Sequence, residues 1–180
     1  MQRTSGIRHA SYILMKLGID TPSSINIEEY PKDFNDAYGT IFDVLSIGIE
    51  ELLQLTDKKD IYTMRHRLNF SFFFLGSLFF FLLSRKLFTE NFAIIGTLIY
   101  ILNPRLIAHG FFNSKDSILQ AFISIVLFFM YNALKTNQNK WFILSGILTG
   151  ICIATRIIAV YIPFLFCFII IIKYLFLFRT

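Results

Sequence analysis

Three groups of basic residues, far apart in the chain, have the chemistry needed to hold a phosphate. The first is Arg65, His66 and Arg67, the second lies within residues 103–117, and the third is Arg156. A guanidinium group presents a planar fork to two phosphate oxygens and stays charged at neutral pH. If the fold brings these groups to one face of a membrane, they favour a phosphate or pyrophosphate ligand.

The densest polar cluster in the second half of the chain is the stretch 103–117, which reads NPRLIAHGFFNSKDS. It lies between two long apolar runs and carries Arg105, His109, Lys115 and Asp116. A reactive site at a membrane face is one interpretation, and an ordinary solvated loop is the other. Asp116 begins the next apolar run, where an acid could simply stabilise the helix dipole.

Simpler roles also fit the remaining basic residues. Arg65 and Arg67 could anchor the chain to lipid headgroups, and Arg156 could extend its side chain to the membrane surface. His109 fits an interfacial histidine that stands apart from the site. One carboxylate among several bases does not specify a reaction, so these residues alone indicate a multi-span protein with one anion-binding face.

The composition is that of a membrane protein. The chain is 55% hydrophobic with 22 phenylalanines and a mean hydropathy of +0.60, whereas soluble domains are about 45–50% apolar. Residues 1–69 hold ten acidic and eight basic residues, a net charge of −2, and residues 70–180 hold two acidic and nine basic residues, a net charge of +7. The basic residues are scattered between apolar runs and form no stripe, which argues against a nucleic-acid partner.

The pattern predicts an all-α fold, a multi-pass transmembrane helical bundle with an amino-terminal extramembrane segment. Residues 1–67 form the extramembrane part, with short amphipathic helices over 6–19 and 38–55 and a charged turn over 56–63. Residues 68–180 form the bundle. About five spans are expected: 68–84, 92–102, 118–134, 142–155 and 157–172. The second can cross the membrane only if its helix continues past Pro104.

Two further features of the bundle follow from spacing. Gly146 and Gly150 are four residues apart and predict a face for close helix packing. Arg156 alone separates the last two spans, which predicts a sharp hairpin. Five crossings then place the groups around Arg65, residues 103–117 and Arg156 on one face, which we assign to the outside or lumen because the long amino-terminal segment lies there.

Several short motifs, taken in order, resemble a known family. They are Tyr-Gly-x-x-Phe from Tyr38, Met-Arg-His-Arg-Leu-Asn before an aromatic span, Asn-Pro-Arg from Asn103, His-Gly-Phe-Phe-Asn-Ser-Lys-Asp from His109, and Gly-Ile-x-x-Ala-Thr-Arg-Ile from Gly150. Together they resemble the amino-terminal part of bacterial membrane glycosyltransferases of the GT-C type, the family-39 enzymes similar to protein mannosyltransferases.

The resemblance implies an enzyme of the plasma membrane that transfers a sugar from a polyprenyl-phosphate donor to an acceptor hydroxyl. It implies that the lipid phosphate is bound by Arg65, Arg67, Lys115 and Arg156. Asp116 resembles the family's acidic residue of the second outer loop, which implies a catalytic role and a bound divalent cation, Mg²⁺ or Mn²⁺. The sugar and the acceptor do not follow from it.

The chain departs from the family pattern at its start. The family's acidic pair follows a first span, and residues 2–5 here, Gln-Arg-Thr-Ser, hold no acid. We therefore expect a fragment that is inactive by itself. The other acids near the start of the chain are candidates for the missing base: Glu28, Glu29, Asp33 and Asp36. A non-enzymatic transporter or assembly subunit, or an inactive remnant, are the competing interpretations.

Overall fold

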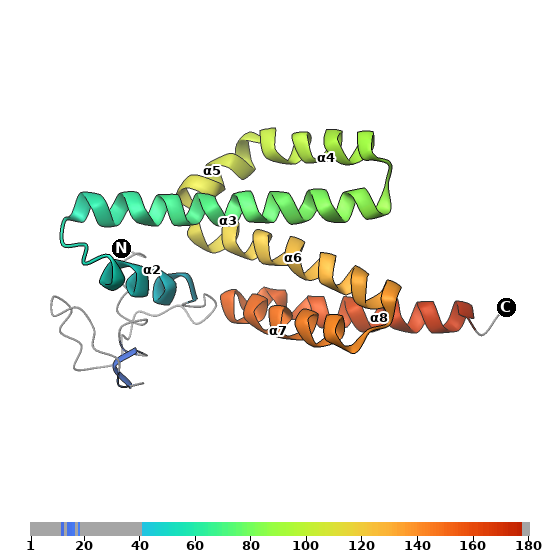
Figure 1. Cartoon of the computed structure of the whole chain (residues 1–180). Helices are drawn as coiled ribbons and strands as arrows, with labels where there is room; N and C mark the ends of the chain where they lie inside the picture. The colour runs from blue at the N-terminus through green and yellow to red at the C-terminus, as the bar shows by residue number, and fades with distance from the viewer. Residues whose placement is uncertain (1–11, 13, 17, 19–40, 178–180) are drawn as a thin grey trace.

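The structure is a computed structural model that describes residues 12, 14–16, 18 and 41–177. Over these residues it is a bundle of helices without a strand, as the sequence predicts (Figure 1). The four candidate acids between residues 28 and 36, and most of the helix expected over 6–19, lie outside the described residues. The helices are α2 (Ile41–Leu52), α3 (Lys58–Leu87), α4 (Glu90–Leu102), α5 (Pro104–Phe112), α6 (Ser114–Thr136), α7 (Asn139–Thr155), the 3-10 helix η1 (Ile157–Val160) and α8 (Tyr161–Leu177).

Helix α3 begins earlier than the sequence pattern indicated. Residues 58–63, predicted as a charged turn, form its first turns, and the helix continues without a break for 30 residues. Asp57 is the N-cap, since its side chain accepts a hydrogen bond from the backbone N–H of Lys59. An acidic first turn with Asp60 and a basic last turn with Arg85 both suit the helix dipole. The prediction of a turn here is therefore wrong.

The second apolar stretch is broken where the sequence places Asn103 and Pro104. The axes of α4 and α5 differ by 58° at this point. The residue before a proline avoids the helical conformation, and Asn103 is extended, with φ −65° and ψ 116°. Its side chain caps α5 by accepting from the N–H groups of Arg105 and Leu106 at 3.0 and 3.4 Å.

Length and composition identify fewer spans than the five that the sequence predicted. Among the described residues, α3 and α6 are long and apolar enough to cross a membrane, and α4 with α5 would make a third, broken span. Helix α7 and the stretch Ile157–Lys173 are apolar but shorter. The helical bundle is confirmed, while the number of spans is two or three by this measure.

The outer faces of these helices are apolar and need a lipid environment. Large side chains such as Phe92, Leu102 and Phe164 are each more than 60% exposed. An apolar surface of this extent does not suit contact with water. Inside the bundle, residues of α6, α7, η1 and α8 form one core cluster: Val126, Met130, Cys152, Ala159 and Ile162.

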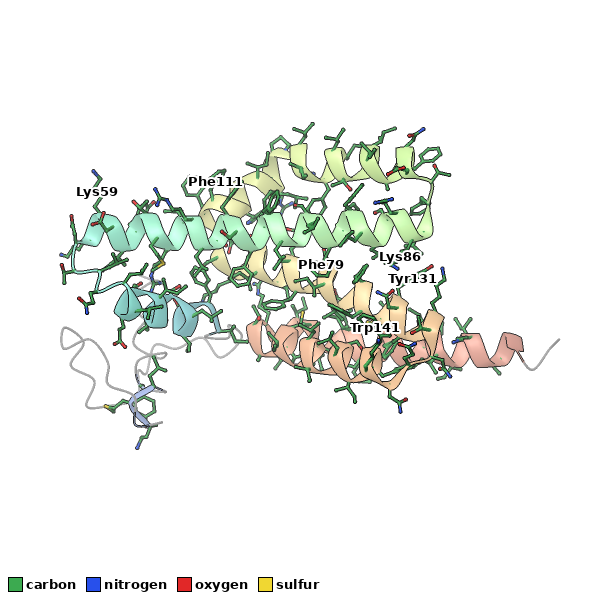
Figure 2. All side chains as sticks on the ribbon, in the orientation of Figure 1. Lys59, Phe79, Lys86, Phe111, Tyr131 and Trp141 are labelled. Atoms are coloured by element: carbon green, nitrogen blue, oxygen red, sulfur yellow. The ribbon has the colours of Figure 1, made fainter. Side chains whose placement is uncertain are left out.

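The elements that carry the candidate site residues meet at one end of the bundle (Figure 1). Helix α2, the start of α3, the α5–α6 junction and the α7–η1 junction lie at that end, and the α3–α4 and α6–α7 connections lie at the other (Figure 1). Lys86, Tyr131 and Trp141 mark the second end (Figure 2), where the Tyr131 hydroxyl donates to the carbonyl of Lys86 at 3.2 Å. The predicted alternation of ends, and the hairpin at Arg156, are thus confirmed.

Among the described glycines, the tightest packing is at Gly76 on α3, which the sequence pattern did not single out. A Cβ added there would lie 2.7 Å from the Cα of Ala121 on α6. The face predicted at Gly146 and Gly150 is wrong, because a Cβ at either position would meet nothing within 4 Å. Close packing therefore joins α3 to α6, the two longest helices.

We predict that Gly76→Ala lowers the free energy of unfolding by about 1–3 kcal/mol, since the added methyl must push α3 and α6 apart. Gly146→Ala is the matched control, because it adds the same methyl to open space and improves helix propensity. Circular dichroism during unfolding with SDS measures both. Equal stability of the two variants would contradict the packing described here.

Candidate functional site

A cavity of about 320 Å³ lies where α2, the first half of α3 and the α5–α6 junction meet. Aromatic and charged side chains from all of these elements line it: Phe42, Asp43, Tyr62, Arg65, His66, Phe112, Asn113, Ser114 and Lys115. It holds two of the basic residues that the sequence selected for phosphate binding, Arg65 and Lys115. A concave site with mixed apolar and charged walls suits a ligand with an anionic head and an apolar body.

Arg65 is buried in the wall of this cavity, with 7% of its surface exposed. Its Nε donates to Oε1 of Glu50 at 2.5 Å, and its Nη1 donates to Oδ1 of Asp43 at 3.3 Å. Both acids lie on α2, seven residues apart and therefore on one face of that helix. The Nη2 atom is buried and has no hydrogen-bond partner among the described residues. Arg65 thus holds α2 in place and keeps one unused donor.

Arg67 lies apart from Arg65, although the two are close in sequence. Two positions along a helix correspond to a rotation of about 200°, and Arg67 is exposed and does not line the cavity. Its assignment to the lipid phosphate finds no support in the geometry. The phosphate-binding roles of Arg65 and Arg67 stay predictions, and of the two only Arg65 lines the cavity.

Asp116 and Arg156 meet as an ion pair, with Nη1 of Arg156 donating to Oδ1 of Asp116. Arg156 has extended backbone between α7 and η1, and its N–H donates to the carbonyl of Cys152. Asp116 lies in the first turn of α6, next to Lys115 in the cavity wall. Two groups 40 residues apart in sequence are therefore brought together, as the predicted topology requires, although neither of them lines the cavity.

Asn113 connects this ion pair to His109. Its Oδ1 accepts from the backbone N–H of Asp116 at 3.2 Å, which makes it the N-cap of α6. Its Nδ2 donates to Oδ2 of Asp116 at 2.7 Å and lies 3.0 Å from Nδ1 of His109. Since the amide nitrogen is a donor, that ring nitrogen is the acceptor. The expectation that His109 stands apart from the site is therefore wrong.

Burial controls the charge of the acid in the cavity wall. Removal from water raises the pKa of the Asp43 carboxyl above its ordinary value, although the positive charges of Arg65 and Lys115 oppose this effect. The nearby Glu50 adds a smaller upward shift. Asp43 is therefore a better proton acceptor than an exposed aspartate.

The residues around Asp116 do not fit a divalent cation. Its two carboxylate oxygens face N–H donors, the Arg156 guanidinium and the Asn113 amide, whereas Mg²⁺ and Mn²⁺ require oxygen ligands. Among the described residues there is also no group of three or more histidine, cysteine or acidic side chains placed to hold a metal. The expected Mg²⁺ or Mn²⁺ site stays a prediction, and no step of the mechanism below passes through it.

The family model of dolichyl-phosphate-mannose-protein mannosyltransferases matches residues 70–179, more than half of the chain. The chain belongs to this family. Searches of curated proteins and of solved structures found no significant match. The sequence-based identification of a GT-C type membrane glycosyltransferase is confirmed. The match covers Lys115, Asp116 and Arg156 and begins after Arg65, so α2 and its contacts lie outside it.

Sequence reasoning missed two acids of this mannosyltransferase-family site and the contact between Asn113 and Asp116. The spacing of Asp43 and Glu50, which puts both on one face of α2, is visible in the sequence. Their partner Arg65 lies on another helix, so the sequence does not show the pairing. Asn113-Ser-Lys-Asp116 has the spacing of a capping box, in which the first and fourth residues of a helix start bond to each other. That spacing could have identified Asn113 as the partner of Asp116.

Removing the charge of Arg65 is predicted to leave the buried Asp43 and the half-buried Glu50 without their ion-pair partner. Arg65→Met should lower the free energy of unfolding by about 3–5 kcal/mol and free α2 from α3. Arg67→Met, on the exposed side of the same helix, is the matched control and should change stability by about 0.5 kcal/mol or less. SDS unfolding and hydrogen exchange of α2 measure the effects. Equal losses in both variants would argue against the pairing.

The buried Asp43 predicts a pH effect of definite sign. Because its pKa is raised above 3.8 in the folded state, folding takes up a proton here, and the stabilisation from that proton is lost as the pH rises through the raised pKa. The unfolding free energy of the wild type, measured relative to Asp43→Asn, should therefore fall across this window. Parallel pH curves for the two proteins would show that the shift is absent.

Proposed function

We propose that this protein transfers a sugar from a polyprenyl-phosphate donor to an acceptor hydroxyl. The family supplies the class, a membrane glycosyltransferase. The donor and the reaction are supported by the cavity at one end of the bundle, where Lys115 and the Nη2 donor of Arg65 lie among aromatic side chains. A phosphate head and a sugar ring are the ligand parts that such walls suit.

The lipid tail of the donor has an apolar path out of the cavity. Phe112 lines the cavity and is 78% exposed. Next to it, Phe111 of α5 stacks on Phe70 of α3, with ring centroids 4.9 Å apart. These exposed rings continue from the cavity onto the apolar outer surface of α3 and α5. A polyprenyl chain could follow them into the bilayer while its phosphate stays in the cavity.

The reaction needs a proton acceptor and a stabilised leaving group. The acceptor hydroxyl loses its proton to a carboxylate and bonds to the anomeric carbon, while the bond from that carbon to the phosphate oxygen breaks. Asp43 is the acid that lines the cavity, and its raised pKa suits it to take the proton. The phosphate leaves as an anion near Lys115 and Arg156 and needs no general acid.

The contacts of Asp116 support a positioning role. Its carboxylate is held by Arg156 and Asn113, so that it directs the guanidinium towards the phosphate. The catalytic assignment made from the sequence stays a prediction. The transporter alternative would favour ionisable residues in the middle of the spans, whereas the ionisable residues described here lie near helix ends, and those of the candidate site share one end of the bundle. A bacterial plasma membrane location is part of the proposal.

Lys115→Ala is predicted to weaken binding of a short-chain polyprenyl-phosphate mannose about 10-fold or more, because a charge-assisted contact is worth about 1.5–3 kcal/mol. Asp116→Asn should slow release of polyprenyl phosphate from that donor in native membranes by a comparable factor. Binding is measured with the full chain in lipid nanodiscs.

Lys140→Ala, at the opposite end of the bundle, is the matched control and should bind like the wild type. Polyprenyl phosphate without the sugar tests the phosphate contact, and polyprenol without the phosphate tests the lipid contact. Equal binding of polyprenol and polyprenyl phosphate would rule out a phosphate site here.

A further inference from the structure

Asn113 makes more contacts than the start of a helix requires. An N-cap needs only a side-chain oxygen that accepts from the first turn, and Ser, Thr or Asp can supply it. Asn103 caps α5 in this simple way, with its Oδ1 accepting from two backbone N–H groups. Asn113 also uses its amide nitrogen, which contacts Asp116 and His109. The extra contacts indicate a role beyond capping.

The position of His109 is fixed through its backbone as well as its ring. Its carbonyl accepts from Nδ2 of Asn69, which is 2% exposed, at 3.2 Å. The same carbonyl accepts from the backbone N–H of Asn113 at 2.9 Å. Its ring Nδ1 then faces the Asn113 amide at 3.0 Å. A proton on Nδ1 would place two N–H donors against each other, so this geometry favours the ring tautomer with its proton on Nε2.

We propose that Asn113 is a positioning residue of the transfer site. Its amide holds the Asp116 carboxylate towards Arg156 and, at the same time, donates to Nδ1 of His109, which keeps the ring proton on Nε2. This role rests on the proposed function, in which Arg156 is the group that meets the leaving phosphate.

The test separates the hydrogen bonds of the Asn113 amide nitrogen from the helix capping by its side-chain oxygen. Asn113→Ser keeps a capping oxygen and removes the amide donor, and Asn103→Ser makes the same exchange at the cap of α5. In full chain labelled with ¹⁵N-histidine, in lipid nanodiscs, His109 of the wild type should show an unprotonated Nδ1 and a protonated Nε2. His109→Gln identifies its signals. Asn113→Ser should give a mixture of both tautomers, and Asn103→Ser should keep the wild-type signals.

Binding of the short-chain polyprenyl-phosphate mannose gives the second readout. Asn113→Ser should weaken it about 10-fold, the effect of losing one hydrogen bond to a charged group, and Asn103→Ser should leave it unchanged. A wild-type His109 with its proton on Nδ1 overturns the proposal, and that measurement needs no folded variant. Equal effects of the two serine variants, or a tautomer change without weaker binding, also overturn it.

Failure of the proposed function would look different. In that case the wild type would bind polyprenyl-phosphate mannose no better than polyprenol, while the ¹⁵N signals of His109 would still decide whether the Asn113 amide fixes its tautomer.

Discussion

The burial of Arg65 is the constraint on which the candidate site depends. A guanidinium cannot give up its proton at any physiological pH, so a buried one must be paired. Asp43 and Glu50 supply the pairing, and both come from α2. The ion pairs therefore fix a helix that lies outside the predicted spans against α3. Because α2 provides one wall of the cavity through Phe42 and Asp43, this pairing holds that wall against α3.

The opposite wall depends on two helix starts. Asn103 and Asn113 each end one helix and cap the next, which places the short helix α5 between two breaks. The first break turns the chain by 58°, and the second brings Lys115 and Asp116 to the end of the bundle. Polar side chains can gather there because helix ends carry free N–H groups and reach the membrane surface. The helix breaks that interrupt the span therefore also position the polar side chains of the site.

Periodicity and composition predicted the amphipathic α2, the apolar helices and the placement of charged residues near helix ends, because these follow from which residues avoid water. Contacts between helices were harder to predict. The charged residues 58–63 were predicted to form a turn, yet they form the first turns of α3 behind its N-cap, Asp57. Arg65 and Arg67 looked equivalent in sequence but point about 200° apart. Close packing occurs at Gly76 because Ala121 happens to face it, which no local pattern encodes.

The charges in the cavity connect proton transfer to departure of the phosphate in the proposed reaction. Arg65 and Lys115 carry two positive charges there, and Asp43 and Glu50 balance them while both are ionised. When Asp43 takes the proton of the acceptor hydroxyl, the net charge of these four side chains changes from zero to +1. This positive charge appears as negative charge develops on the leaving phosphate, so the electrostatic stabilisation is greater in the transition state than in the ground state. A carboxylate paired with arginine in the resting site is therefore compatible with catalysis.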